Sequence, residues 1–221
     1  MIVVHHLNNS RSQRILWLLE ELGLDYEIVK YLRDPATNLA PASVRDVHPL
    51  GKLPVIRDRE LLLAESGAII QYLLDRYSDG RLMPAPDSPE RIRFLYWMHY
   101  AEGSAMPALL LKVVFDQIEA GPVPFFIRPV TRGLSRAVKQ RLVQPQIERH
   151  LDFLEAELGS APYFAGDSLT AADIQLSFPL EGAAARAGLD SRRPRLMAWL
   201  ERIHARPAYR RAIERGGPYA L

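Results

Sequence analysis

Residues 2–32, which read IVVHHLNNSRSQRILWLLEELGLDYEIVKYL, decide the fold of the N-terminal part of the chain. Ile2 to Leu7 is short and rich in branched residues, which is typical of a buried strand. Tyr26 to Leu32 alternates like a second strand. Between them, apolar residues repeat at helical spacing until Gly23 ends the helix: Ile15, Leu18, Leu19 and Leu22. The order strand, helix, strand predicts a right-handed parallel crossover.

The next segment has the outline of a hairpin followed by a helix. A polar, proline-bearing stretch ends at Val47, and two short apolar runs then lie on either side of the charged residues RDRE at 57–60. We expect these runs, Leu53 to Ile56 and Leu61 to Ala64, to be two strands. Ser66 to Tyr77 returns to helical spacing. Residues 1–82 therefore form one α/β unit.

A proline-rich segment separates this unit from the rest of the chain. Residues 83–89, MPAPDSP, hold three prolines in seven positions, as a linker does. Beyond it strand signals nearly vanish, and helical patterns cover Pro89 to Ala120, Phe125 to Leu158, Thr170 to Ala187 and Pro194 to Arg206. We expect residues 90–221 to form an all-helical domain.

Charge and composition exclude several classes of protein. The 28 basic and 26 acidic residues leave a formal net charge of only +2, so we expect no nucleic-acid partner. The chain has no cysteine, which excludes disulfides, thiolate zinc sites and a cysteine nucleophile, and we expect no metal. The N-terminus MIVVHHL is too short for a signal peptide, and no apolar run approaches the roughly 18 residues of a membrane span. We expect a cytoplasmic protein without membrane contact.

Two junctions carry candidate binding residues. In HPLGKLPVI, residues 48–56, Pro54 begins a strand, and a cis bond before it would turn the backbone of Leu53 toward an open groove; an ordinary loop is the alternative. In LAESG, residues 63–67, Ser66 opens a helix whose N-terminus favours a carboxylate, while Glu65 offers an acceptor for an ammonium group. The alternative for Ser66 is a cap on its own helix.

Two further motifs resemble capping boxes. Thr170 and Asp173 in DSLTAADI have the S/T-x-x-D spacing, so we expect them to fix the start of a core helix and to take no part in chemistry. In HLNNSRSQRILW, residues 6–17, Ser10 and Gln13 form a second box, S-x-x-Q. Whether Ser10 caps the helix or faces a ligand is left open by the residues alone.

These pieces, in this order, resemble the cytosolic glutathione transferases over essentially the whole chain. The most specific are GKLPV at 51–55, the Glu65-Ser66 pair and LTAADI at 169–174. SRSQRILWLLEELGLDYEIV, HYAEGSAMPALL and SFPLEGA are most similar to the subgroup of the yeast-type enzymes and their bacterial relatives. The resemblance implies a thioredoxin-like N-terminal domain that binds glutathione, followed by an all-α helical bundle that supplies the pocket for an electrophile.

The resemblance also implies roles for individual residues. It implies a cis Leu53–Pro54 bond beside the cysteinyl part of glutathione, Glu65 and Ser66 at the γ-glutamyl head, and Lys52 near the tripeptide. His48 would approach the glycyl carboxylate, or be a plain loop histidine. Asn9 also belongs to the predicted glutathione site. For the electrophile pocket, the resemblance points to Tyr100 and Met106, although residues at this spacing are commonly core.

For the sulfur itself, Ser10 is the best positional match to the family's catalytic residue, because no tyrosine precedes Tyr26. Asn8 and Asn9 are alternative donors, and Arg11 would raise the local positive potential.

The expected function is therefore glutathione transferase, which conjugates reduced glutathione as co-substrate to small hydrophobic electrophiles through a stabilised thiolate, with organic peroxide reduction as a further activity. The family normally forms homodimers, so we expect one here. The alternative is a non-catalytic binding or regulatory protein of the same fold. A thiol-disulfide oxidoreductase is disfavoured because its usual mechanism needs a protein thiolate.

Overall fold

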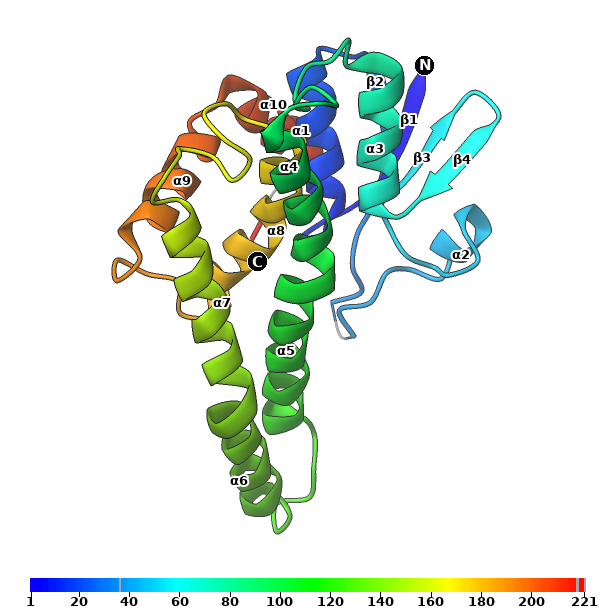
Figure 1. Ribbon diagram of the computed structural model, residues 1–221. Coiled ribbons are helices and arrows are strands. Elements are labelled where there is room, and N and C mark those ends of the chain that lie inside the picture. The colour runs from blue at the N-terminus through cyan, green and yellow to red at the C-terminus, as the bar shows by residue number, and fades with distance from the viewer. Residues whose placement is uncertain (36, 218, 221) are drawn as a thin grey trace.

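The computed structural model describes residues 1–35, 37–217 and 219–220, and its N-terminal unit is built on a four-stranded sheet (Figure 1). The strand order is β2-β1-β3-β4. The strands are β1 Ile2–Leu7, β2 Tyr26–Tyr31, β3 Val55–Asp58 and β4 Leu61–Ala64. β1 pairs with β2 in parallel, as predicted, whereas β1 with β3 and β3 with β4 are antiparallel.

Two helices of this unit pack together beside the sheet, α1 (Ser12–Leu22) and α3 (Ser66–Tyr77), and a short helix, α2 (Val44–Val47), precedes the hairpin (Figure 1). The apolar residues that predicted α1 are buried, and Gly23 ends the helix in the left-handed region with φ 68°. The hairpin begins later than predicted, at Val55 instead of Leu53. The reason is that Pro54 lacks the N–H that a paired strand residue donates.

The regular elements of the C-terminal unit are all helices among the residues that the structure describes, apart from an isolated β-bridge between Tyr163 and Gly166. Its elements are α4 Pro89–Tyr100, α5 Met106–Ala120, α6 Arg128–Val138, α7 Gln144–Glu157, α8 Ala171–Arg186, α9 Pro194–His204 and α10 Pro207–Gly216. π-helical turns at Ala101–Ala105 and Lys139–Val143 join α4 to α5 and α6 to α7. The predicted arrangement, a thioredoxin-like unit followed by an all-α unit, is confirmed.

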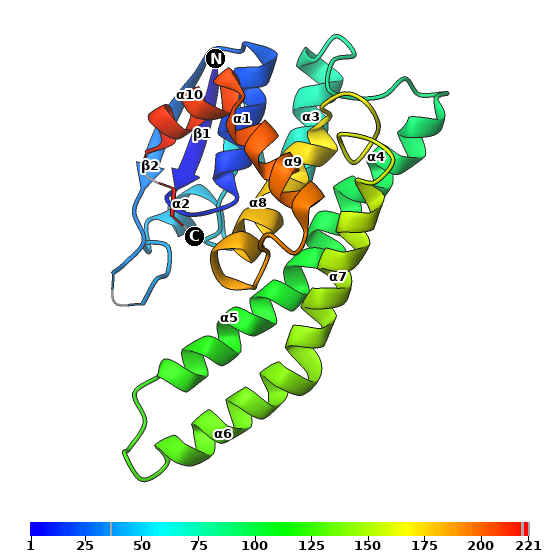
Figure 2. The ribbon, with the colours of Figure 1, turned by 90° about the vertical axis from the view of Figure 1, so that its left-hand side faces the viewer.

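The last helix, α10, was not predicted, because the helical pattern ends at Arg206 and Pro207 interrupts it. In the structure Pro207 lies in the first turn of α10, where its missing N–H costs no hydrogen bond. α10 packs back on α1, and the rings of Tyr209 and Trp17 meet edge to face with centroids 5.2 Å apart (Figure 2). The C-terminal segment thus closes over the N-terminal unit.

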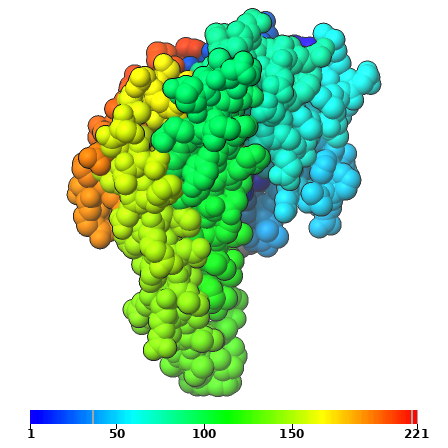
Figure 3. All heavy atoms as spheres, viewed as in Figure 1, coloured from blue at the N-terminus to red at the C-terminus, as the bar shows by residue number. Residues whose placement is uncertain are grey.

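The helices α5 and α6 form a hairpin that protrudes from the body (Figure 2), and Figure 3 shows it as a separate arm. Within the described ranges, no helix is both long and apolar enough to cross a bilayer.

The helix α8 begins with the predicted capping box, in which the Thr170 amide donates to Asp173 Oδ2 at 3.0 Å. That prediction is confirmed.

Candidate functional site

A pocket of about 230 Å³ opens where the start of α1, the segment before β3 and the start of α3 meet the π-helical turn after α4. It brings together six of the residues predicted from the sequence, which are His48, Lys52, Leu53, Pro54, Glu65 and Ser66. Arg11 and Glu102 also line it. The pocket therefore has both basic and acidic side chains in its lining, contributed by different segments of the chain, and this combination suits a zwitterionic ligand.

The backbone at Leu53 borders this pocket. The Leu53–Pro54 peptide is cis, so this prediction is confirmed. The sheet ladder begins only at Val55, which pairs with Ala64 and with His5. Leu53 thus lies beyond the paired part of the strand, at an edge where an extended peptide can align.

The turn from β4 into α3 aims a second set of groups at the pocket. Glu65 has φ 70°, a left-handed conformation that costs a non-glycine residue energy and is typical of functional turns. Ser66 is the first residue of α3 and is buried, and its hydroxyl oxygen accepts a hydrogen bond from Arg14 Nη1 at 3.3 Å. The N-cap position of α3 is Glu65 and not Ser66, and the Glu65 side chain makes no cap hydrogen bond. The structure therefore does not support the capping alternative.

The carboxylate of Glu102, from the helical unit, lies between two arginines. Arg11 directly precedes α1, and Arg14 is in its first turn. Arg11 Nε donates to both oxygens of Glu102, at 3.1 and 3.0 Å, and Arg14 Nη1 donates to Oε1 at 2.5 Å. Arg14 is almost fully buried and also donates to Gln175 in α8 at 3.0 Å. Burial raises the pKa of Glu102, but Arg14 and Arg11 together hold it below its usual value. Glu102 is therefore ionised and joins the two units.

Sequence reasoning missed Arg14 and did not place Glu102 at this first pocket. The two residues are 88 positions apart in the chain, so no local pattern indicates that they form an ion pair.

Ser10 is close to the pocket in sequence but is not among the described residues that line it. It is buried, with 4% of its surface exposed, and its hydroxyl donates to the Leu7 carbonyl at 2.8 Å. The Ser12 amide donates to the same hydroxyl oxygen at 3.2 Å. The helix begins at Ser12, and no hydrogen bond joins the buried side-chain amide of Gln13 to any described residue, so the S-x-x-Q box is not formed.

A second pocket, of about 330 Å³, adjoins the first, and Arg11 lines both. Two predicted residues, Asn9 and Met106, belong to it. Asn9 has φ 50° and accepts a hydrogen bond from the Ala220 amide at 2.8 Å, while Asn8 accepts one from the Arg33 amide at 2.8 Å. The structure therefore places Asn9 with the predicted electrophile pocket and away from the described lining of the first.

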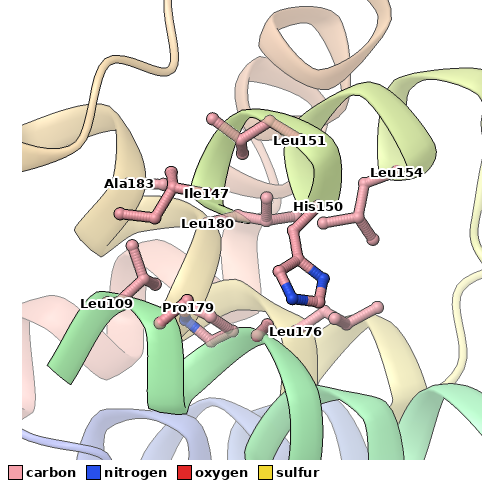
Figure 4. Close-up of a pocket in the computed structure, with 11 residues that line it drawn as sticks. Leu109, Ile147, His150, Leu151, Leu154, Leu176, Pro179, Leu180 and Ala183 are labelled. Atoms are coloured by element: carbon pink, nitrogen blue, oxygen red, sulfur yellow. The ribbon is translucent and has the colours of Figure 1, made fainter. Parts of the chain in front are cut away.

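Tyr100, the other residue assigned to the electrophile pocket, lies elsewhere. It is buried, and its hydroxyl is hydrogen-bonded to His150 Nδ1 of α7. Figure 4 shows His150 reaching into a hollow between α5, α7 and α8. This hollow holds about 20 Å³, enough for roughly one water molecule, so it is a packing gap and too small for a substrate.

Comparisons with known proteins agree with the geometry. Family models described as the N-terminal and C-terminal domains of glutathione S-transferase match residues 1–75 and 116–202. Glutathione S-transferase 3 of Schizosaccharomyces pombe is 36% identical over 217 residues, which cover 97% of this chain and 88% of that protein. A crystal structure of a glutathione S-transferase from Actinobacillus pleuropneumoniae is 37% identical, with a TM-score of 0.81, and the match covers 98% of this chain and 93% of that one. A sphingomonad glutathione S-transferase complexed with glutathione is 26% identical, with a TM-score of 0.74 and coverage of 97% and 98%.

Proposed function

Because the chain belongs to the glutathione S-transferase family and is a glutathione transferase, we propose that it conjugates reduced glutathione to small hydrophobic electrophiles through a thiolate held at the mouth of the first pocket. The resemblance to yeast-type and bacterial transferases is confirmed. The observation that carries the proposal is the convergence of the Leu53 backbone edge, Glu65 and Ser66 on one pocket.

In the proposed complex the charged ends of the tripeptide lie at groups of opposite charge or at hydrogen-bond donors, and its backbone lies along the strand edge. The γ-glutamyl carboxylate lies at Ser66 and the free N–H groups that open α3, and the γ-glutamyl ammonium lies at Glu65. The cysteinyl backbone aligns with Leu53. The glycyl carboxylate lies toward Lys52 and His48, whose Nδ1 is buried and has no hydrogen-bond partner among the described residues.

The thiol is ionised by donors at the start of α1, and we propose Ser10 as the donor. A hydrogen bond to a charged acceptor contributes about 1.5–3 kcal/mol, which lowers a thiol pKa of about 8.5 by roughly one to two units. To act in this way, the Ser10 hydroxyl must exchange its bond to the Leu7 carbonyl for one to the sulfur. The thiolate then forms a C–S bond as the leaving group departs from the electrophile.

The first test measures turnover of chlorodinitrobenzene with glutathione for the parent protein and for Ser10→Ala, together with glutathione affinity by calorimetry. We expect the parent to turn over and Ser10→Ala to lose about tenfold or more in kcat with similar affinity, since one charge-assisted hydrogen bond disappears. Tight binding without turnover by the parent would support the non-catalytic alternative. Unchanged turnover in Ser10→Ala would leave the role to Asn8, Asn9 or Arg11.

Peroxide reduction is a further proposal for the same thiolate: two glutathione molecules and one organic hydroperoxide give the alcohol, water and glutathione disulfide. The measurement is disulfide production with cumene hydroperoxide.

We also propose the domain division predicted from the sequence. Residues 1–82 form the domain that binds glutathione, residues 83–89 form the linker, and residues 90–221 form the helical domain with the electrophile pocket.

We also propose that the chain is a homodimer, and a pair of apolar side chains on α4 supports this. Ile92 is 71% and Tyr96 is 49% exposed, and they lie one helical turn apart. Sedimentation is expected to give twice the 25.0 kDa of one chain, and Ile92→Glu is expected to shift the equilibrium toward monomer. A parent protein that sediments as a monomer at micromolar concentration would contradict this prediction.

A further inference from the structure

The second pocket has an apolar wall formed mainly by one face of α5. Met106, Leu109, Leu110, Val113 and Val114 recur at the spacing of one helical face, and they line the pocket. Leu110 is 56% and Val114 41% exposed, so this face is covered by no other part of the described chain. From α8, Phe178 adds an aromatic ring. Such a wall fits the apolar body of a small molecule.

The charged residues of the described lining are all basic, and Asn9, Asn38 and Gln117 add neutral polar groups. Arg33 comes from the loop after β2, which lies beside α5 in Figure 1, and Arg186 comes from the last turn of α8. Arg11 and Lys112 complete the set. Among the described residues that line this pocket there is no carboxylate. Four cations thus lie around the apolar wall of α5, and no acidic residue is found in the part of the lining that the structure describes.

Two of these cations form ion pairs with carboxylates outside the lining. Arg11 is paired with Glu102 at 3.0 Å, and Lys112 with Asp116 at 2.6 Å. Their charges are therefore committed to the protein.

The other two are available to a ligand. Arg33 donates to three backbone carbonyls, of Asn8, Asn9 and Asn38, which are neutral acceptors. No hydrogen bond or ion pair joins the exposed side chain of Arg186 to any residue within the described ranges. Arg33, Arg11 and Arg186 line the same pocket, and burial together with the positive charges of the other two lowers the pKa of Arg33. The pocket therefore carries a positive potential that the protein leaves uncompensated.

We propose that the electrophile of this enzyme is an apolar molecule that carries an acidic group, such as a carboxylate, which Arg33 and Arg186 bind while α5 and Phe178 hold its apolar body. This inference rests on the proposed function and names its substrate class. Guanidinium groups bind carboxylates through paired hydrogen bonds, and the partly apolar surroundings strengthen them. Arg11, at the border of both pockets, marks where the electrophilic carbon meets the sulfur.

The test compares two aryl chlorides that react by the same chemistry, chlorodinitrobenzene and a chlorodinitrobenzoate with a ring carboxylate. In both, the glutathione sulfur forms the C–S bond, chloride leaves with the bonding electrons, and the thiol proton passes to solvent. We expect kcat/KM, divided by the uncatalysed rate constant with glutathione, to be about tenfold higher for the benzoate. The preference is expected to fall as salt screens the pocket.

Two matched variants test whether Arg186 causes the preference for the benzoate. Arg186→Gln is expected to lower the benzoate-to-benzene ratio about tenfold, because it removes a cation that has no hydrogen-bond or ion-pair partner among the described residues. Arg132→Gln, on α6 and outside the described lining, removes an exposed cation of the same type and is expected to keep the ratio of the parent.

Binding of the two reaction products separates this inference from the proposed function. The carboxylated S-conjugate of glutathione is expected to bind about tenfold more tightly than the neutral one in calorimetry, and Arg186→Gln is expected to remove the difference. If neither chloride is turned over, the proposed function fails, while the product affinities still test the pocket. Equal product affinities, equal normalised rates, or an equal loss of the ratio in Arg132→Gln would overturn the inference.

Discussion

Replacing Asp173 by alanine is expected to destabilise the protein by about 4 kcal/mol, because one buried carboxylate serves four donors. Its oxygens accept from the amides of Phe164 and Thr170 at 3.1 and 3.0 Å, from the Thr170 hydroxyl at 3.1 Å and from Trp199 Nε1 at 3.1 Å. The group is fully buried. Each buried donor left without an acceptor costs roughly 1–3 kcal/mol. Urea unfolding followed by tryptophan fluorescence gives the free energy of unfolding.

Two controls separate the hydrogen bonds from charge and from general sensitivity to substitution. Asp173→Asn keeps the shape and one acceptor oxygen, so we expect a smaller loss than for alanine. Asp190→Ala removes a half-exposed carboxylate that, within the described ranges, is paired with Arg192 alone, and solvent-exposed pairs of this kind contribute about 0–1 kcal/mol. A loss below about 1 kcal/mol for Asp173→Ala would show that these hydrogen bonds are replaced by water.

The elements predicted from sequence are those whose signal is local. The periodicity of residues 15–22, the cap at Gly23 and the box at Thr170 each lie within one turn or one helix, and each was confirmed. α10 was missed because Pro207 is compatible both with the end of one helix and with the first turn of the next. Only the packing of α10 on α1 distinguishes the two.

The residues of the site also differ in whether a local sequence pattern indicates their position. Glu65 and Ser66 line one pocket at a strand end and a helix start, where a local pattern can indicate their position, and their role in binding glutathione stays a prediction. Tyr100 belongs to α4 and bonds to His150, whereas Met106 opens α5 and lines the second pocket. The π-helical turn between the two helices lies outside the regular periodicity from which a shared face was predicted. Arg33 and Arg186 are separated by most of the chain, and no local pattern indicates that they share a pocket.

Replacing Arg14 by methionine is expected to weaken glutathione binding about tenfold or more and to cost about 3 kcal/mol of stability. Arg14 holds the Ser66 hydroxyl, Glu102 and Gln175 through one nitrogen, Nη1, at the boundary of the two units. Removing one partner of a buried pair leaves the other charge uncompensated, which costs roughly 3–5 kcal/mol; Arg11 retains part of this interaction. Calorimetry gives the affinity and urea unfolding the stability.

The pH dependence of the stability lost in Arg14→Met tests whether the charge of Glu102 causes that loss. The pKa of Glu102 is held below its usual value of 4.5, so its ionised form stabilises the fold above that pH, and this contribution is lost as pH falls through the lowered pKa. The stability gap between parent and Arg14→Met is therefore expected to be full near pH ~7 and to shrink toward pH ~3. Arg136→Met, which breaks an ion pair whose arginine is 63% exposed, is expected to show a gap below about 1 kcal/mol. A gap for Arg14→Met that stays constant with pH would mean that lost packing, and not the charge of Glu102, carries the effect.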